Sequence, residues 1–355
     1  MAAWRLKETE LDLLTQGIVG GAVALSVANK TSAHHAVAIG FAAGLLADTD
    51  ILIHSDTDPL LNIELHRHFT HALIFIPVGA LIATLLIWPI LRHRLRFGQI
   101  YLYAVAGYAT SGLLDACTSY GTHLLWPFSD TRVAWSIISI VDPVFTLLLI
   151  AAIVSGWRQR SPAPARIGLL CASIYLLLGW WQHQAALDTA QALAAQRGHT
   201  PTRLLVKPTL ANLLLWRSVY QHEDRYYVDA IRVGFGSQRV YPGSSIARFS
   251  LQREFPELPA DSVLARDIAR FHRLSDGYIA RDTSRAAVLT DIRYSMLPTS
   301  LTPMWGIDLH QAAPQQSARF INFRDRPDHL RTQFMAMLLG RDLPSSNGAA
   351  AASTD

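Results

Sequence analysis

The sequence predicts an all-α polytopic membrane domain of about six helices over residues 1–184, followed by a small α+β extramembrane domain over residues 185–343. Half of the 355 residues are hydrophobic and only 16% are charged, whereas ordinary soluble domains contain about 25% charged residues. The hydrophobic residues gather in the first half of the chain, and strand-like patterns fill the second half. Residues 344–355 are expected to be a disordered tail.

Six apolar segments define the predicted membrane domain. Those near 70–91 and 137–156 are long enough to cross about 30 Å of hydrocarbon as helices, whereas the others are shorter. Gly40 and Gly44 form a G-x-x-x-G pair that would allow a short helix to pack closely. A soluble helical core, buried on every side, is the alternative. The segments lie near residues 13–28, 34–47, 70–91, 99–117, 137–156 and 167–183.

The charges of the loops predict an orientation. Loops 92–97 and 157–166 carry six arginines and no acidic residue. If all six segments cross the membrane, the positive-inside rule places these loops in the cytoplasm. The opposite loops, 48–69 and 118–136, and the C-terminal half would then lie on the outer side of the membrane. The loss of one short span would reverse this orientation.

Acidic and imidazole side chains lie at the ends of three apolar segments. Acidic groups at the ends of apolar helices are costly when they are unpaired, so each needs a partner or a metal. Carboxylate and imidazole together suit Zn²⁺, Mn²⁺ or iron. The polar residues concerned are Asp48, Asp50, His66, Arg67, His68, His71 and Asp115.

Most of these residues also fit a simpler role. Asp48 and Asp50 fit the end of a helix at a solvated loop, and His66 and His68 fit a solvated loop. Asp115 is the hardest to explain in this way, because it lies deep in an apolar segment.

Two positions resemble helix starts. Thr70 is a good N-cap for the third apolar segment, and it would place His71 in the first helical turn. Asp142 followed by Pro143 is typical of an N-cap and an N1 proline.

The chain resembles the YdjM-like family over about residues 10–160. The segments "DLLTQGIVGGAV", "GLLADTDIL", "HRHFTHAL", "LLDACTSYGTHLLWPFSD" and "IVDPVFTLLL" follow one another in that family's order and spacing. The family is described as inner-membrane, metal-dependent hydrolases, also called LexA-binding or LexA-regulated. It is similar, more distantly, to helical zinc-dependent phospholipases C. The resemblance implies metal ligation by Asp48, Asp50, His66, His71 and Asp115, with Arg67 behind the ligands or on the substrate.

The chain departs from the family pattern at two positions. Many members have histidine one helical turn before the aspartate that matches Asp115, where this chain has Ser111. Short members often have Thr-His near the start, where this chain has Thr15 and Gln16. Glutamine binds a metal through its carbonyl oxygen, but more weakly than imidazole. The two replacements therefore affect how many metal ions the site would hold and whether it would be competent for catalysis.

The C-terminal half has the pattern of an α+β domain without a recognisable catalytic motif. Residues 185–200 predict an Ala-rich helix that ends at Gly198. The domain is expected to cap the metal site or to bind a partner. Strands are predicted over 202–209, 213–223, 225–235, 238–243, 286–297 and 318–325, and further helices over 259–278 and 327–343.

The sequence favours a membrane-bound, metal-dependent hydrolase that acts on an ester or phosphodiester of a lipid or membrane-associated substrate. Asp115 and Arg67 are the expected catalytic residues, and Arg67 would neutralise the anionic group of the substrate. The expected cofactor is a divalent metal, Zn²⁺ first and Mn²⁺ or iron as alternatives.

Other classes of function remain open. A non-catalytic membrane protein with a structural metal site and an interaction domain is the main alternative, and a transporter that couples through Asp115 is another. The lipid bilayer is the expected partner. No nucleic-acid partner is expected, because the net charge of +4 is small and spread along the chain.

Overall fold

The computed structural model describes most of the chain. The predicted tail, residues 344–355, lies outside the described residues, and residues 2–12, 328 and 329 are described by their backbone alone. The described residues are 2–53, 55, 58–234, 236–309, 313–323 and 328–343. The chain divides into a helical unit, residues 1–55, 61–181 and 210–213, and a C-terminal unit, residues 56–60, 182–209 and 214–355.

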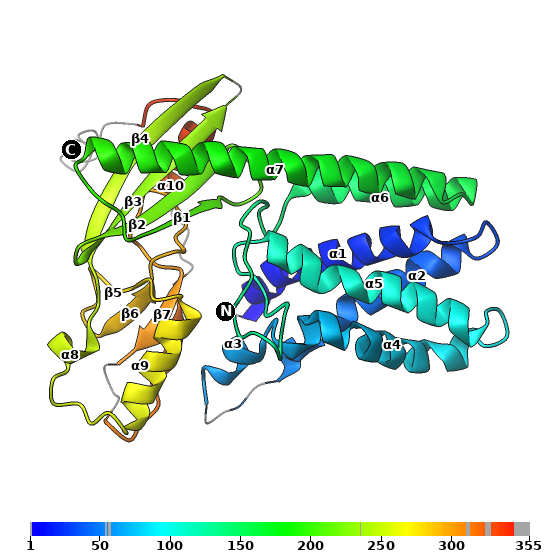
Figure 1. Cartoon of the computed structure of the whole chain (residues 1–355), viewed down its shortest axis with the longest axis horizontal. Helices are drawn as coiled ribbons and strands as arrows, with labels where there is room; N and C mark the ends of the chain where they lie inside the picture. The colour runs from blue at the N-terminus through cyan, green and yellow to red at the C-terminus, as the bar shows by residue number, and fades with distance from the viewer. Residues whose placement is uncertain are drawn as a thin grey trace, which may run out of the picture. The chain divides into compact units, whose positions relative to one another are not determined.

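The helical unit is a bundle of long helices. Helices α1, α2, α4 and α5 lie side by side, and α6 lies along the first half of α7 (Figure 1). The long helices are α1 (Ala2–Ser26), α2 (Ala33–Leu46), α4 (Ile76–Leu91), α5 (Phe97–Cys117), α6 (Pro143–Gln159) and α7 (Ala163–Gln196). Short helical turns connect α2 to α4: η1 (Ala47–Leu52), α3 (Leu61–Leu65), η2 (Phe69–His71) and η3 (Leu73–Phe75).

Among the residues that the structure describes, three stretches are long and apolar enough to cross a membrane: Ala33–Leu52, Leu73–Leu91 and Ala163–Gln196. Leu13–Ser26 and Pro143–Gln159 are apolar but shorter. The prediction that the 137–156 segment is a long helix is wrong, because residues 137–142 are not helical.

The start of α6 confirms the predicted cap. Asp142 Oδ1 accepts a hydrogen bond from the backbone N–H of Phe145 at 3.1 Å, and Pro143 occupies the first helical position. The prediction for Thr70 is wrong, since it and His71 lie in η2 and α4 begins at Ile76. An N-cap is an extended residue directly before a continuous helix. Thr70 does not meet this condition, because the turns η2 and η3 lie between the start of its segment and α4.

Helix α7 is longer than the sequence predicted. The apolar segment 167–183 and the Ala-rich segment 185–200 form one helix of 34 residues. Alanine has the highest helix propensity, and no proline or glycine interrupts the chain between Gly179 and Gly198. Gly198, with φ +73°, follows the helix in a left-handed conformation that glycine adopts readily. The predicted domain boundary after residue 184 therefore lies inside a continuous helix.

Glycines hold α1, α2 and α5 close together. A Cβ atom on Gly40 would lie 2.4 Å from the backbone oxygen of Gly20, and one on Gly107 would lie 2.3 Å from the backbone oxygen of Gly40. A Cβ atom on Gly44 would lie 2.9 Å from the backbone oxygen of Gln16. These distances leave no room for a side chain, which confirms the close packing predicted for the G-x-x-x-G pair.

The described residues of the C-terminal unit form two four-stranded antiparallel sheets, as expected for an α+β domain. The first has the order β1 (Arg203–Pro208), β2 (Leu215–His222), β3 (Arg225–Gly234), β4 (Ser237–Ala247). The second has the order β5 (Ile279–Arg281), β6 (Val288–Asp291), β7 (Trp305–Asp308), β8 (Arg319–Asn322). The helices are α8 (Leu251–Glu254), α9 (Val263–Leu274) and α10 (Asp328–Leu338).

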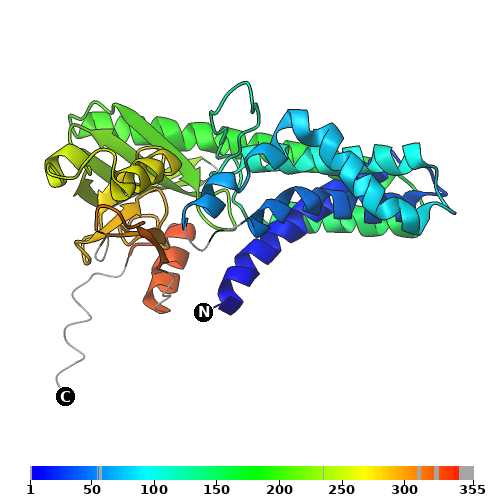
Figure 2. The ribbon, with the colours of Figure 1, turned by 90° about the horizontal axis from the view of Figure 1, so that it is seen from below.

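Helices cover both faces of the first sheet (Figure 2). Successive side chains of a strand point to opposite faces. Leu215 accordingly packs with Met337 of α10 on one face, and Trp216 packs with Ala186 and Ala190 of α7 on the other. The strand pattern of the sequence therefore reflects a sheet that is buried on both sides.

Candidate metal centre

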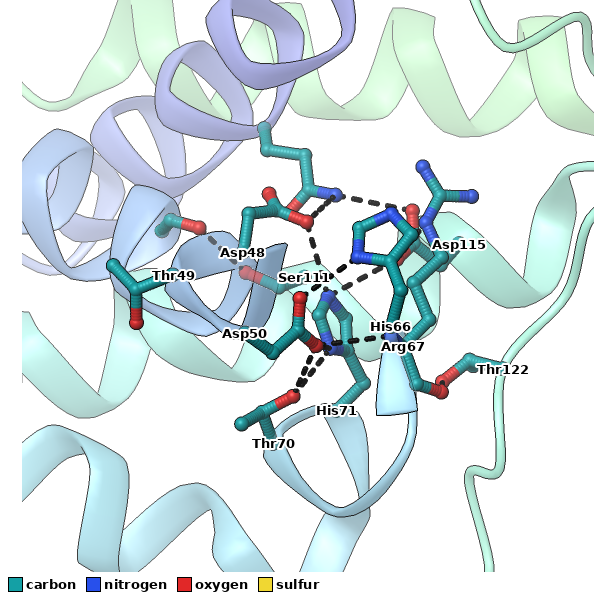
Figure 3. Close-up of polar contacts among 12 residues, drawn as sticks. Asp48, Thr49, Asp50, His66, Arg67, Thr70, His71, Ser111, Asp115 and Thr122 are labelled. Carbon is teal, nitrogen blue, oxygen red and sulfur yellow. Dashed lines mark hydrogen bonds and ion pairs between the residues drawn. The ribbon is translucent and has the colours of Figure 1, made fainter. Parts of the chain in front are cut away.

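Three parts of the helical unit bring polar side chains to one buried place (Figure 3). Asp48 and Asp50 lie on η1, which continues directly from α2. His71 lies on η2, and Asp115 lies in the last turn of α5. These four side chains belong to residues that are at most 4% exposed. The structure therefore gathers residues that are far apart in the sequence into one polar site within an apolar bundle.

Asp48, His71 and Asp115 form a group that could hold a metal ion. Each offers one ligand atom, and these atoms all lie within 4.8 Å of one another. Nε2 of His71 is 3.4 Å from Oδ1 of Asp48 and 3.1 Å from Oδ2 of Asp115. In a tetrahedral zinc site with metal–ligand distances of about 2.0–2.1 Å, neighbouring ligand atoms lie about 3.3 Å apart. The two distances from Nε2 of His71 fit such a site.

Several buried atoms of this group lack hydrogen bonds. Oδ2 of Asp48, Oδ2 of Asp115 and Nε2 of His71 have no hydrogen-bond partner among the described residues, although charged contacts of 3.1 to 3.4 Å surround the imidazole. Buried polar atoms in folded proteins almost always have a partner. A bound cation would provide one, so the donor set fits a metal.

The charges around the group also favour a bound metal ion. Asp48, Asp50 and Asp115 place three carboxylates in the buried site, and the arginine that faces them is Arg67. Nε of Arg67 lies 3.1 Å from Oδ2 of Asp115. Uncompensated charge within an apolar bundle is costly. A divalent cation would balance the two remaining negative charges.

Asp50 faces the other side of the imidazole ring. Its Oδ2 accepts hydrogen bonds from the Thr70 hydroxyl at 2.7 Å and the Arg67 backbone N–H at 2.9 Å. Its Oδ1 lies 2.7 Å from Nδ1 of His66. Nδ1 of His71 lies 2.9 Å from the Thr70 hydroxyl. Asp50 and Thr70 therefore hold the ring so that its Nε2 faces Asp48 and Asp115.

The predicted ligands thus divide into two sets. Asp48, His71 and Asp115 come together, whereas Asp50 and His66 form a neighbouring pair outside that group. The assignment of Asp50 and His66 as ligands stays a prediction.

The loop that carries Arg67 is held in an unusual conformation. Arg67 has φ 61°, which is uncommon for a residue with a side chain and costs about 1–3 kcal/mol. Its backbone oxygen accepts hydrogen bonds from the Thr122 hydroxyl at 2.9 Å and the His123 N–H at 3.2 Å. Its guanidinium lies 5.9 Å from the centre of the Tyr120 ring. The motif around Thr122 therefore helps to position Arg67 at the site.

The two departures from the family pattern have different surroundings. Nε2 of Gln16 donates to Oδ1 of Asp115 at 3.1 Å and lies 3.4 Å from Oδ1 of Asp48. The Ser111 hydroxyl instead donates to the backbone oxygen of Gly44 at 2.8 Å. Gln16 is therefore part of the polar group, and Ser111 ties α5 to α2.

Sequence reasoning missed His123. Its ring lies 4.6 Å from that of His68, measured between ring centres. Burial, reinforced by Arg132, lowers the pKa of His123 to about 4 and also lowers the pKa of His68. Both rings are therefore neutral at pH 7. The position of His123 in the specific run "TSYGTHLLWPF" was the available signal.

We expect Thr70→Val to weaken metal binding about 10- to 100-fold, because groups that orient a ligating histidine typically contribute this much. Competition with a chromogenic chelator would measure the affinity. Thr84→Val is the matched control, since Thr84 is also buried but donates to the backbone oxygen of Ala80 within α4. Unchanged affinity in Thr70→Val would contradict the role assigned to Thr70.

A bundle with three candidate membrane-spanning stretches and a buried group of carboxylates and imidazole indicates a membrane protein with a candidate metal centre. Residues 11–186 match the model of the family described as YdjM inner membrane protein. This region of the chain therefore belongs to the YdjM inner membrane protein family, as the sequence motifs predicted. The family and the apolar helices support a location in the bacterial inner membrane.

Two curated proteins are similar to this chain. Inner membrane protein YbcI of Escherichia coli (strain K12) is 29% identical over 134 residues, which cover 36% of this chain and 75% of YbcI. Uncharacterized protein YfhP of Bacillus subtilis (strain 168) is 26% identical over 163 residues, or 45% of this chain and 48% of YfhP. The chain thus spans about half the length of YfhP. No solved structure matches the chain.

Proposed function

We propose that the chain is a membrane-bound, metal-dependent hydrolase that acts on an ester or phosphodiester of a lipid or membrane-associated substrate. The observation that carries this proposal is the meeting of Asp48, His71 and Asp115 with ligand atoms within 4.8 Å of one another. Buried carboxylate and imidazole ligands suit Zn²⁺, with Mn²⁺ or iron as alternatives.

The residues of the site would have separate tasks. Asp48, His71 and Asp115 would hold the metal, and Asp50 would keep the His71 ring in place. When bound, the metal would act as a Lewis acid and make a water molecule more acidic. Arg67, beside Asp115 at 3.1 Å, would neutralise an anionic group of the substrate.

The charges of the loops favour a periplasmic site. Arg92, Arg94 and Arg96 follow α4 at the end opposite to η2, where His71 lies. The positive-inside rule assigns such an arginine-rich loop to the cytoplasm. The metal centre at the other end of α4 would then face the periplasm, close to the lipid headgroups.

Arg67→Gln tests the function, and we expect about 100-fold slower hydrolysis with the metal retained, since a group that stabilises developing charge is typically worth this much. The full chain in nanodiscs would be loaded with Zn²⁺, Mn²⁺ or Fe²⁺. Release of product would then be measured from phospholipids, bis(p-nitrophenyl) phosphate and p-nitrophenyl esters.

Arg166→Gln is the control for this experiment. Nε of Arg166, on α7, donates to the backbone oxygen of Ser26 at the end of α1 and makes no contact with the metal-centre residues among those described. Its rate should match that of the unmodified chain. Metal-loaded protein that cleaves no member of the panel would exclude the hydrolase for these substrates and favour the structural metal site.

A further inference from the structure

The C-terminal unit contains a cavity of about 620 Å³ that has no part in the metal centre. It lies between one face of α9, the segment after β4 and the start of β5. Its volume is within the range of about 300–1,000 Å³ that is typical of small-molecule sites. The residues that line it are Arg248, Phe249, Ser250, Leu251, Arg266, Ile268, Ala269, Arg270, His272, Arg273 and Ile279.

The lining of the cavity is basic. Four arginines and one histidine contribute to it, and none of the described lining residues is acidic. Three of these arginines, Arg266, Arg270 and Arg273, are spaced at i, i+4 and i+7 along α9, so they share one face of the helix. Such a concentration of positive charge favours an anionic ligand.

Two of the three arginines on α9 are not neutralised by an acidic side chain among the described residues. Arg270 is engaged, because it bonds to Asp58 and Asp267 at 2.9 to 3.2 Å. Arg266 and Arg273 form no ion pair with the residues that the structure describes, and both are exposed. They are therefore available to bind a phosphate or carboxylate group through paired N–H donors.

Arg248, on the opposite wall, supplies an independent observation. Its Nε atom is buried and has no hydrogen-bond partner among the described residues. Nη2 of the same side chain lies 4.0 Å from Oδ1 of Asp224, and the other oxygen of that carboxylate is bonded to Arg253 at 2.7 Å. A buried donor without an acceptor is rare in a folded protein. An anion in the cavity would provide that acceptor.

The base of the cavity is apolar. Phe249, Ile268 and Ile279 line it and are at most 6% exposed. Ala269 lies between the basic side chains on α9 and contributes only a methyl group to the lining. A ligand that fills the space would therefore contact hydrocarbon as well as guanidinium groups.

We propose that this cavity binds an anionic amphiphile, with a phosphate head at Arg266 and Arg273 and a short alkyl chain against Phe249 and Ile268. The ligand class follows from the basic rim and the apolar base together. The proposal is independent of the metal centre and of any hydrolysis.

Octyl phosphate is the probe for this site. Calorimetric titration would use the full chain in nanodiscs, with the heat of empty nanodiscs subtracted. We expect saturable binding of octyl phosphate that is at least 10-fold tighter than binding of inorganic phosphate or of octanol. If inorganic phosphate binds as tightly as octyl phosphate, the proposal of an amphiphilic ligand is overturned, and the cavity is a simple anion site.

Variants locate the binding site. The double substitution Arg266→Gln and Arg273→Gln should weaken binding of octyl phosphate at least 10-fold, and Ala269→Phe should do the same by filling the cavity while all charges remain. The control is the double substitution of Arg319 and Arg331 by glutamine, which removes the same charge from exposed positions outside the cavity. Equal binding by the two double variants would overturn the proposal.

Discussion

His71→Ala and Asp115→Asn are each expected to lower the bound metal from about one ion per chain to less than about a tenth. Each substitution removes one of three groups whose ligand atoms meet within 4.8 Å. Changes to residues that merely orient a ligand weaken metal binding about 10- to 100-fold, so the loss of a ligand should have a larger effect. Elemental analysis of the purified full chain, after dialysis against a metal buffer, would measure the loss.

Asp142→Asn is the matched control for this prediction. Asp142 is also a buried aspartate, but it caps α6 and accepts a hydrogen bond from the Tyr175 hydroxyl at 2.9 Å. Its removal should leave the metal content unchanged. One metal ion per chain in the combined His71→Ala and Asp115→Asn variant would contradict the assignment.

The same measurement separates a metal centre from a purely ionic cluster. In a purely ionic cluster, the contact of His66 with Asp50 and that of His71 with Asp115 would take the place of metal coordination. In that case the unmodified chain would bind no metal after exposure to Zn²⁺, Mn²⁺ or Fe²⁺. The substitutions would then destabilise the protein without changing its metal content.

Gly107→Leu is expected to destabilise the helical unit by about 3 kcal/mol or more, which is the upper range for overpacking a core. A Cβ atom at this position would lie 2.3 Å from the backbone oxygen of Gly40, so α2 and α5 would have to separate. Their separation would also move Asp48 away from Asp115. Thermal unfolding in detergent should show a lower Tm, and metal binding should weaken with it.

Gly98→Leu is the control, because it adds the same side chain to the same helix. A Cβ atom on Gly98 would meet nothing within 4 Å. The Tm of this variant should remain within about 2 °C of the original, since exposed substitutions usually change stability by less than about 0.5 kcal/mol. A Gly107→Leu variant with an unchanged Tm would show that the helices do not need this close contact.

The sequence predicted the broad architecture because its strongest signals are local. Each apolar segment contains a helix, and the segments rich in Val, Tyr and Leu became strands. The strand β5 was missed because its three residues are too few to display an alternation, and β7 was missed because Gly306 and Asp308 are residue types depleted in strands. The start of α4 was missed because the turns η2 and η3 depend on packing against other segments.

The candidate site was predicted only in part, because only some of its signals are local in the sequence. An acidic residue inside an apolar helix, such as Asp115, is conspicuous in any sequence. Which of the predicted ligands meet depends on the path of the loop from His66 to His71, and the left-handed conformation of Arg67 sets that path. Neither that conformation nor the hydrogen bonds of Thr70 could be derived from spacing, so Asp50 and Asp48 appeared equivalent.

The Thr70 hydroxyl decides which tautomer His71 adopts. A hydroxyl group has one hydrogen, and Thr70 donates it to Oδ2 of Asp50 at 2.7 Å. The contact of 2.9 Å between the same oxygen and Nδ1 of His71 can then form only if the ring carries its hydrogen on Nδ1. A neutral His71 consequently presents a lone pair, rather than a hydrogen, to Asp48 and Asp115. Serine at position 70 would preserve this selection, and valine would abolish it.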